Sequence, residues 1–319
     1  MICDPVLIVG APRSGTSLLQ KILRNHTAFW SLPSESEMVW DKYCHPRLRN
    51  WDSECVDEAA MTPRIREDLR RDFENHMWPA RVWGPIERTN LIWGFRRRPL
   101  IQAAMKNIYR LASPPLRGLF SRHRTKRFVE KTVSNCLRLG FVDEVFPDAR
   151  IVYVVRDGRN SVNSLINSWL HPTRFFTYDV PERLDMRGYP HGRWKFVLPP
   201  GWRRYVRRPL EEVCAFQWQS CNDAVLAEIA KPRYAGRVLR LRIEDVAACP
   251  ADWLCRLAEF VGLRYDDYFR GLADDLPVVN SADNDTSREK WRYQNRDMVE
   301  RVVSTIQPTM WRLGYEVPT

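Results

Sequence analysis

The sequence predicts an α/β protein with a central parallel sheet flanked by helices. Two segments indicate this fold, residues 7–23 and residues 149–169, because each has an apolar run, a glycine-containing turn and an amphipathic helix in succession. No linker, low-complexity tract or internal repeat interrupts the 319 residues. We therefore expect a single domain over 1–319.

The first segment reads LIVGAPRSGTSLLQKIL. Its apolar start predicts a buried strand over 5–10, and apolar residues at helical spacing predict a helix over 15–26. The free N–H groups of the turn and the positive end of the helix dipole favour an anion at this point. The turn therefore predicts a phosphate cradle formed by Arg13, Ser14, Gly15, Thr16 and Ser17.

This turn departs from the Walker A loop, G-x-x-x-x-G-K-[ST], of P-loop kinases and NTPases. Gly10, Gly15 and Ser17 fit that pattern, but Thr16 stands where the lysine should be and the cation is Arg13. Without the lysine, the loop is poorly equipped to hold a β/γ-phosphate pair with magnesium. It can still hold one phosphate and a charged group that leaves from it.

The second segment reads ARIVYVVRDGRNSVNSLINSW. Its continuous apolar run is typical of a parallel strand buried on both faces, here 150–156, and a helix is expected over 160–169. Arg156 follows the strand, at the edge where open α/β sheets bind ligands, and Ser164 lies on the helix. A guanidinium fork and a hydroxyl so placed predict a second, separate phosphate site.

Two phosphate sites indicate a nucleotide with phosphates on both sides of its ribose. PRSGTS resembles the 5′-phosphosulfate loop of sulfotransferases that use 3′-phosphoadenosine-5′-phosphosulfate (PAPS). VVRDGRNSVNS resembles the 3′-phosphate motif of that family, with Arg156 and Ser164 at the matching positions. The likeness runs in order from about Val6 to Tyr315 and is weak or absent over 41–125 and 170–208.

Three further segments resemble the same family. Glu130-Lys131-Thr132 is similar to its E-K-T-P segment, with Val133 in place of the proline. LRIEDV, followed by FVGL, is similar to its Y-E-D-L strand and helix, with Ile243 in place of the usual tyrosine. Lys290-Trp291 and the terminal LGY resemble the end of the tyrosylprotein-type and related bacterial members.

The resemblance implies a P-loop-like fold and transfer of a sulfuryl group from PAPS to a hydroxyl acceptor. It assigns Lys131 to the bridging oxygen, Arg13 to the transferring group and Lys290 to the nucleotide. The acceptor proton needs a base, and LPSESEMVW is similar to the family's glutamate-bearing turn. Glu35 aligns better than Glu37 with that position, but both are expected near one cleft, and the choice between them stays open.

The remaining elements follow from periodicity and breakers. Helices are expected over 34–42, with Ser34 as N-cap, and over 63–76, 100–112, 135–146, 209–230, 251–261 and 295–313; strands are expected over 127–130 and 237–243. We interpret 41–125 and 170–208 as helical and irregular insertions on the acceptor side, the second forming a long lid, and expect a loop over 274–288.

The net charge of +11 and the isoelectric point near 9.4 admit a nucleic-acid-binding protein as an alternative. The basic residues are scattered among acidic ones, so we expect no nucleic acid as partner. An anionic nucleotide accounts for part of the surplus, and an acidic acceptor or a membrane face could use the remainder. A P-loop-type kinase or NTPase is the alternative among enzymes.

Cysteine and histidine spacing bears on the compartment and on metals. The eight cysteines form no C-x-x-C pair and are expected to be reduced, and no histidine pair has metal-ligand spacing. No apolar run is long enough for a bilayer, and the first strand begins within six residues of Met1. We expect a cytoplasmic enzyme that needs no metal. The sequence leaves open the oligomeric state and the acceptor: sugar, lipid, peptide or secondary metabolite.

Overall fold

The computed structural model describes residues 2–32, 34–87, 126–277 and 289–316, and its centre is a five-stranded sheet. The strand order is β2-β3-β1-β4-β7, and every pairing is parallel. The strands are β1 (Val6–Val9), β2 (Phe29–Trp30), β3 (Arg127–Glu130), β4 (Arg150–Val155) and β7 (Val238–Arg242). The predicted fold class, a P-loop-like parallel sheet flanked by helices, is confirmed.

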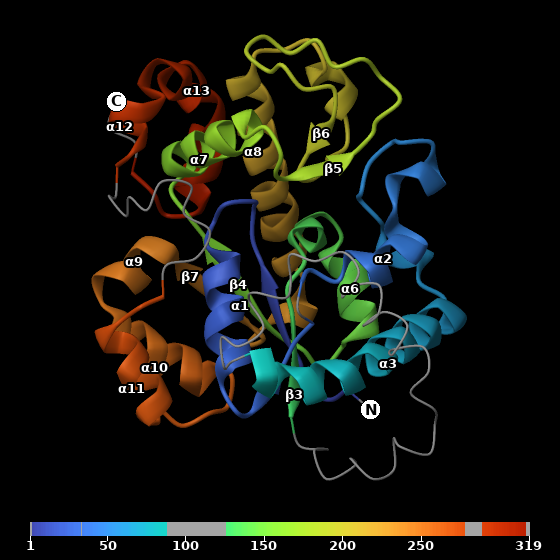
Figure 1. Ribbon diagram of the computed structural model, residues 1–319, viewed down its shortest axis with the longest axis vertical. Helices are drawn as coiled ribbons and strands as arrows, with labels where there is room; N and C mark the ends of the chain where they lie inside the picture. Colours follow the sequence, from blue (N-terminus) through green and yellow to red (C-terminus); the bar gives the residue numbers. More distant parts are fainter. Residues whose placement is uncertain (1, 33, 88–125, 278–288, 317–319) are drawn as a thin grey trace.

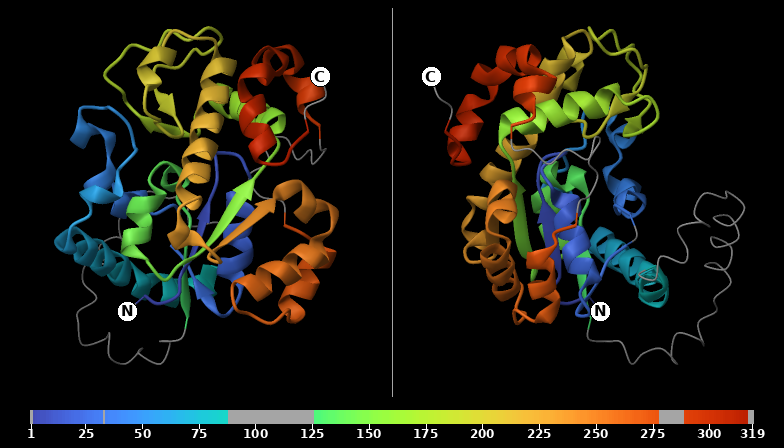
Figure 2. Two further views of the ribbon diagram at one scale, coloured as in Figure 1. Left: turned by 180° about the vertical axis from the view of Figure 1, so that it is seen from behind. Right: turned by 60° about the vertical axis from the view of Figure 1, so that its left-hand side comes forward.

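Alternate residues of the central strands face two separate cores. Val6 and Ile8 of β1 pack in one core with apolar residues of α1 (Thr16–Asn25), α10 (Pro250–Phe260) and α11 (Asp267–Asp274). Leu7 and Val9 face the other core, which includes α3 (Pro63–Glu87), α6 (Leu139–Val145) and α8 (Leu210–Ile229). The sheet is thus the middle of three layers, seen nearly edge-on in Figure 2.

The remaining elements lie around the carboxyl ends of the strands. They include α2 (Glu37–Cys44), α7 (Gly158–Leu170), α9 (Ile243–Ala248), α12 (Trp291–Gln294), α13 (Arg296–Arg312) and the antiparallel pair β5 (Phe176–Tyr178) and β6 (Trp194–Lys195). In Figure 1, α7, α13 and the β5–β6 pair lie above the end of the sheet to which the strands point.

The predicted start of the helix over 34–42 is wrong. Ser36, and not Ser34, is the N-cap of α2, and the Ser34 hydroxyl donates to the carbonyl of Glu35 instead. Tertiary contacts fix this position, because the Ser36 hydroxyl donates to Glu130 at 2.6 Å and its N–H donates to Thr132 at 2.9 Å. Sequence patterns close to the helix carry no information on these distant partners.

The single helix expected over 135–146 is divided. A 3₁₀ helix (Val133–Leu137) precedes α6, and Arg138 between them has φ −143°. Side-chain hydrogen bonds hold this junction, since Asn135 donates to Glu130 at 3.0 Å and accepts from Arg138 at 3.0 Å. Buried polar contacts therefore override the helical pattern here.

The structure differs from the sequence predictions in several other elements. β2, α9 and α11 were not predicted, and the helix expected over 100–112 lies outside the described residues. Residues 170–208 are largely irregular, as expected, but they include the β5–β6 pair and fully buried tryptophans, Trp194 and Trp202. In the part of the chain that the structure describes, no helix is long and apolar enough to cross a membrane.

Gly10 supports the contact between β1 and β4. A Cβ at this position would lie 2.4 Å from the carbonyl oxygen of Val154, a backbone atom that no rotamer change can move away. We expect Gly10→Ala to lower the free energy of unfolding by about 1–3 kcal/mol, measured by urea unfolding. Gly271→Ala is the matched control, because nothing lies within 4 Å of its new Cβ. The packing argument fails if both variants are as stable as the parent.

Candidate active site

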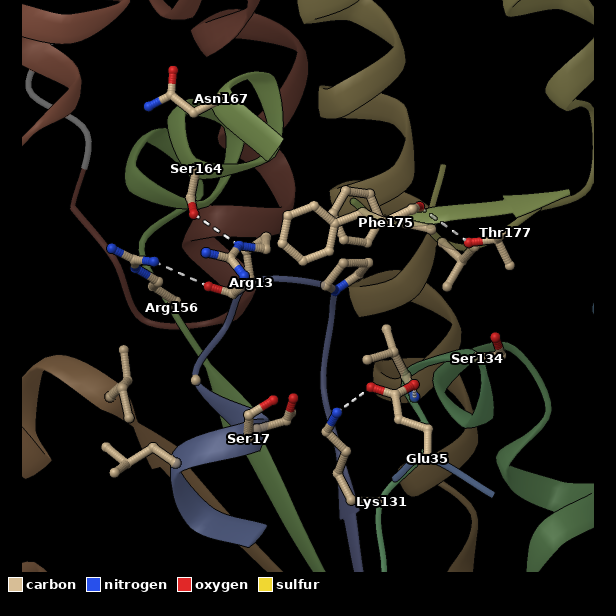
Figure 3. A pocket seen from close by; sticks show the side chains of 18 of the residues that line it. Arg13, Ser17, Glu35, Lys131, Ser134, Arg156, Ser164, Asn167, Phe175 and Thr177 are labelled. Carbon is tan, nitrogen blue, oxygen red and sulfur yellow. Dashed lines mark hydrogen bonds and ion pairs between the residues drawn. The ribbon is translucent and has the colours of Figure 1, made fainter. Parts of the chain in front are cut away.

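The carboxyl ends of three neighbouring strands, β3, β1 and β4, open into one cavity of about 670 Å³. Each strand end supplies a cation, namely Lys131 after β3, Arg13 after β1 and Arg156 after β4. The structure brings almost all predicted site residues to this cavity (Figure 3): Arg13, Gly15, Thr16, Ser17, Glu35, Lys131, Arg156, Ser164 and Lys290. Ser14 is the exception, since it is fully buried beneath the loop.

The loop between β1 and α1 has the features of an anion cradle. Gly15 is the N-cap of α1 with φ 98°, and no acidic residue lies in the first turn to neutralise the positive end of the helix. Gly15, Thr16 and Ser17, at the start of this helix, all line the cavity. The positive end of α1 is therefore open to the cavity, so this loop fits a bound oxyanion.

The two phosphate motifs contact each other directly. Arg13 Nε donates to Ser164 Oγ at 3.0 Å, and Arg156 donates to the Arg13 carbonyl at 3.0 Å. Arg156 is held between β4 and α7, whose N-cap Asp157 accepts from the N–H of Arg159 at 2.8 Å. Segments about 140 residues apart therefore form one surface.

This surface concentrates positive charge. Burial, followed by the nearby Arg156 and Arg174, lowers the pKa of Arg13 to about 10. Burial also lowers the pKa of Arg156, although Glu244 and Asp157 oppose the shift. Both shifts mean that the charged form of each guanidinium group is destabilised in this surface. An anion bound between the two groups would stabilise the charged form of both.

Lys131 and Glu35 form an ion pair on the floor of the cavity. Lys131 is only 4% exposed, and Glu35 also accepts from the N–H of Val133 at 3.1 Å. The carboxylate is therefore held from two sides, by the ammonium group at the end of β3 and by the backbone that follows it.

Glu130 has a positioning role that sequence analysis missed, although its motif was recognised. Its buried carboxylate accepts from the Ser36 hydroxyl at 2.6 Å, Trp40 Nε1 at 2.8 Å and Asn135 Nδ2 at 3.0 Å. These bonds fix the start of α2, and with it Glu35, against the end of β3. Burial nevertheless raises the pKa of Glu130, and the hydrogen bonds limit the shift.

A second network that sequence analysis missed joins α7 to α12. Gln294 accepts from Asn163 at 2.9 Å and from Asn167 at 3.0 Å, and Asn295 donates back to both asparagines. These amides bring the C-terminal segment to the cavity, and Lys290, which is 9% exposed, lines it from that side. Amide residues at helical spacing on α7 were the available sequence signal.

A family model described as the sulfotransferase family matches residues 5–267, most of the chain. The chain belongs to the sulfotransferase family. The predicted enzyme class, a PAPS-dependent sulfotransferase, is thereby confirmed, and the kinase and nucleic-acid-binding alternatives receive no support.

One solved structure agrees with this assignment at the level of the fold, and a second match is given beside it. The sulfotransferase domain from the curacin biosynthetic pathway matches with a TM-score of 0.51 and 16% identity over 99% of each chain. The sulfotransferase domain of the Synechococcus PCC 7002 olefin synthase matches with a TM-score of 0.48 and 15% identity, over 99% of this chain and 97% of that one. No curated protein matches the chain at a significant level.

Other parts of the sulfotransferase cavity have an aromatic and acidic lining. Residues of the 170–208 segment form an aromatic wall that includes Phe176, Tyr178 and Phe196, and α2 contributes Glu37 and Asp41. Glu37 is partly open to solvent, but its side chain lines the cavity. Partial desolvation of its carboxylate, followed by the neighbouring carboxylates of Glu35, Glu54 and Asp41, raises its pKa to about 7.

This shift predicts how stability depends on pH. The pKa of Glu37 rises from 4.5 to about 7 on folding, so the folded state binds more protons and loses stability as pH increases between these values. Glu37→Gln removes this loss. We expect the variant to gain up to about 1 kcal/mol over the parent near pH 8, after solvent screening, and nothing near pH 4.

Urea unfolding at both pH values measures the effect. Glu67→Gln, which changes an exposed glutamate on α3 outside the cavity, is the control and should shift little at either pH. If Glu37→Gln changes the free energy of unfolding equally at pH 4 and pH 8, the raised pKa of Glu37 is wrong.

Proposed function

We propose that this sulfotransferase binds PAPS across the arginine-lined half of the cavity and sulfates a hydroxyl acceptor held in the other half. The α1 N-terminus with Gly15, Thr16 and Ser17 takes the 5′ side of the nucleotide, and Arg156 with Ser164 takes its 3′-phosphate. The observation that carries this proposal is the 3.0 Å contact between Arg13 and Ser164, because it joins the two phosphate motifs in a single cavity.

The residues present fit such a ligand. The α1 N-terminus without an acidic residue and the lowered pKa of Arg13 both favour a bound anion. Lys290 adds a cation from the start of α12. Bound PAPS supplies the sulfuryl group, on the oxygen of its 5′-phosphate.

The protein's own side chains then have distinct tasks. Glu35 takes the proton of the acceptor hydroxyl, and its ion pair with Lys131 holds the carboxylate in position to do so. Lys131 has three N–H donors, so it can hold Glu35 and still donate to the departing phosphate oxygen. Arg13 stabilises the charge on the transferring group.

We further propose that residues 1–319 act as one domain in the cytoplasm, with 170–208 as an acceptor-side insertion; much of the other expected insertion, 41–125, lies outside the described residues. The position of Phe176, Tyr178 and Phe196 in the cavity wall supports an acceptor-binding role for the second insertion. All eight cysteines are free, which is typical of a reducing compartment.

The donor site is tested by nucleotide binding. We expect adenosine 3′,5′-bisphosphate (PAP), the product nucleotide, to raise the melting temperature in the presence of EDTA, and ATP to do so much less. Arg156→Ala removes a charged forked contact, and charged hydrogen bonds are worth about 1.5–3 kcal/mol each. PAP should therefore bind about tenfold to a thousandfold more weakly, by calorimetry, with little change in folding.

Arg256→Ala, on the exposed face of α10, is the matched control and should bind PAP as the parent does. If Arg156→Ala also binds PAP as the parent does, the assignment of the 3′-phosphate site is wrong.

The base is tested by comparing two isosteric changes. Glu35→Gln keeps the size of the side chain but cannot take a proton, so kcat should fall about a hundredfold to ten-thousandfold while PAP affinity stays nearly unchanged. Glu37→Gln should reduce kcat much less. The reverse order, an active Glu35→Gln and an inactive Glu37→Gln, would assign the base to Glu37.

A further inference from the structure

The acceptor half of the cavity contains two carboxylates without partners. Glu37 and Asp41 are four residues apart on α2 and His45 follows after another four, so all three share one helix face, and all three line the cavity. Neither carboxylate has an ion pair or a side-chain hydrogen bond with any residue in 2–32, 34–76, 126–277 or 289–316.

The surrounding cations do not balance these charges. Lys131 is paired with Glu35, and Lys195 donates to the carbonyls of Ser168 and His171. The buried Arg138 lies near Asp41, but it also faces the buried carboxylate of Glu54.

Two like charges at this spacing on a helix repel each other. Burial raises the pKa of Asp41, and the neighbouring carboxylates add to the rise at Glu37. His45 and Arg138 favour the charged form of Asp41 and so offset part of its burial, whereas the charges around Glu37 are mainly carboxylates. The unbalanced negative charge is therefore greatest at Glu37, which would gain from a positively charged ligand.

Ser134 gives an independent sign that a ligand binds here. It lines the cavity from the 3₁₀ helix after β3 and is only 4% exposed, yet its hydroxyl has no hydrogen bond with a described residue. It follows Val133, whose N–H donates to Glu35, and Figure 3 shows Ser134 and Glu35 in the same corner of the cavity. A hydroxyl at the cavity wall that has no described hydrogen-bond partner can bind a polar group of the acceptor.

We propose that the acceptor carries a cationic nitrogen, such as a protonated amine, which Glu37 and Asp41 bind while the hydroxyl lies toward Glu35 and Lys131. This inference rests on the proposed function and names the substrate class of the same cavity. The net charge of the whole chain, +11, would favour an acidic acceptor, but the carboxylates at the contact surface would repel one. The aromatic wall with Tyr178 and Phe196 receives the apolar body of the acceptor.

The test uses near-isosteric phenols of three charges: tyramine, 4-propylphenol and 3-(4-hydroxyphenyl)propanoate. The aliphatic set is 3-aminopropan-1-ol, butan-1-ol and 3-hydroxypropanoate. Transfer of labelled sulfate from PAPS gives kcat/KM, and calorimetry gives the affinity of each compound for the PAP-loaded protein. We expect the cationic member to exceed the neutral one about tenfold or more in at least one set, and the anionic member to be the poorest.

Substitution of the carboxylates tests whether Glu37 and Asp41 cause the preference for a cationic acceptor. Asp41→Asn should reduce the ratio of cationic to neutral kcat/KM about tenfold to a hundredfold, mainly through KM, and Glu37→Gln should reduce it as well. The control Asp72→Asn makes the same chemical change to a carboxylate that Lys42 pairs at 3.2 Å, and should leave the ratio unchanged.

The outcomes separate the two proposals. The inference is overturned if the parent uses the neutral or anionic compounds as well as the cationic ones, or better. It is also overturned if Asp41→Asn leaves the ratio of cationic to neutral kcat/KM unchanged. In either case normal PAP binding would show that the proposed donor site still holds. If no compound is sulfated, the affinities of the three charge types for the PAP-loaded protein, measured by calorimetry, are compared in the same way and decide whether the inference holds. Loss of PAP binding itself in the parent would instead overturn the proposed function.

Discussion

The proximity of Arg13 and Arg156 at neighbouring strand ends is the constraint on which the site depends. The parallel register of β1 and β4 brings the two residues together, and the 3.0 Å bond from Arg156 to the Arg13 carbonyl keeps them there. Two guanidinium groups with lowered pKa values are an unfavourable arrangement in the unliganded protein. Burial is the main cause of both shifts, so an anion bound between the two guanidinium groups would offset the cost of desolvating their charges, in agreement with the donor site proposed above.

The charge of the lining side chains differs from one part of the cavity to another. Arg13 and Arg156 line the proposed donor part, the carboxylates of Glu37 and Asp41 line the proposed acceptor part, and the Glu35–Lys131 ion pair also lines the cavity. The pair at the boundary is fixed through Glu130, which ties the start of α2 to the end of β3 by buried hydrogen bonds. A transfer reaction needs donor and acceptor held in fixed relation, and these bonds supply that rigidity without touching either ligand.

Sequence patterns predicted those parts of the molecule that local chemistry determines. The apolar runs before Arg13 and Arg156 located β1 and β4, and the glycine turn located the cradle. The parts that depend on distant partners were missed: the true N-cap Ser36 and the break at Arg138 both arise from contacts with the Glu130 network. The partnerless carboxylates on α2 were equally invisible, because a sequence does not show which charges remain unpaired after folding.

We infer that one nucleotide bridges both phosphate motifs and is bound by both Arg13 and Arg156. Calorimetry with PAP and with the two adenosine monophosphates, 5′-AMP and 3′-AMP, tests this most directly. The account predicts that PAP binds at least about tenfold more tightly than either monophosphate, since each phosphate adds charged hydrogen bonds at its own motif. Equal affinity for PAP and one of the monophosphates would show that only one motif contacts the nucleotide and would contradict the claim.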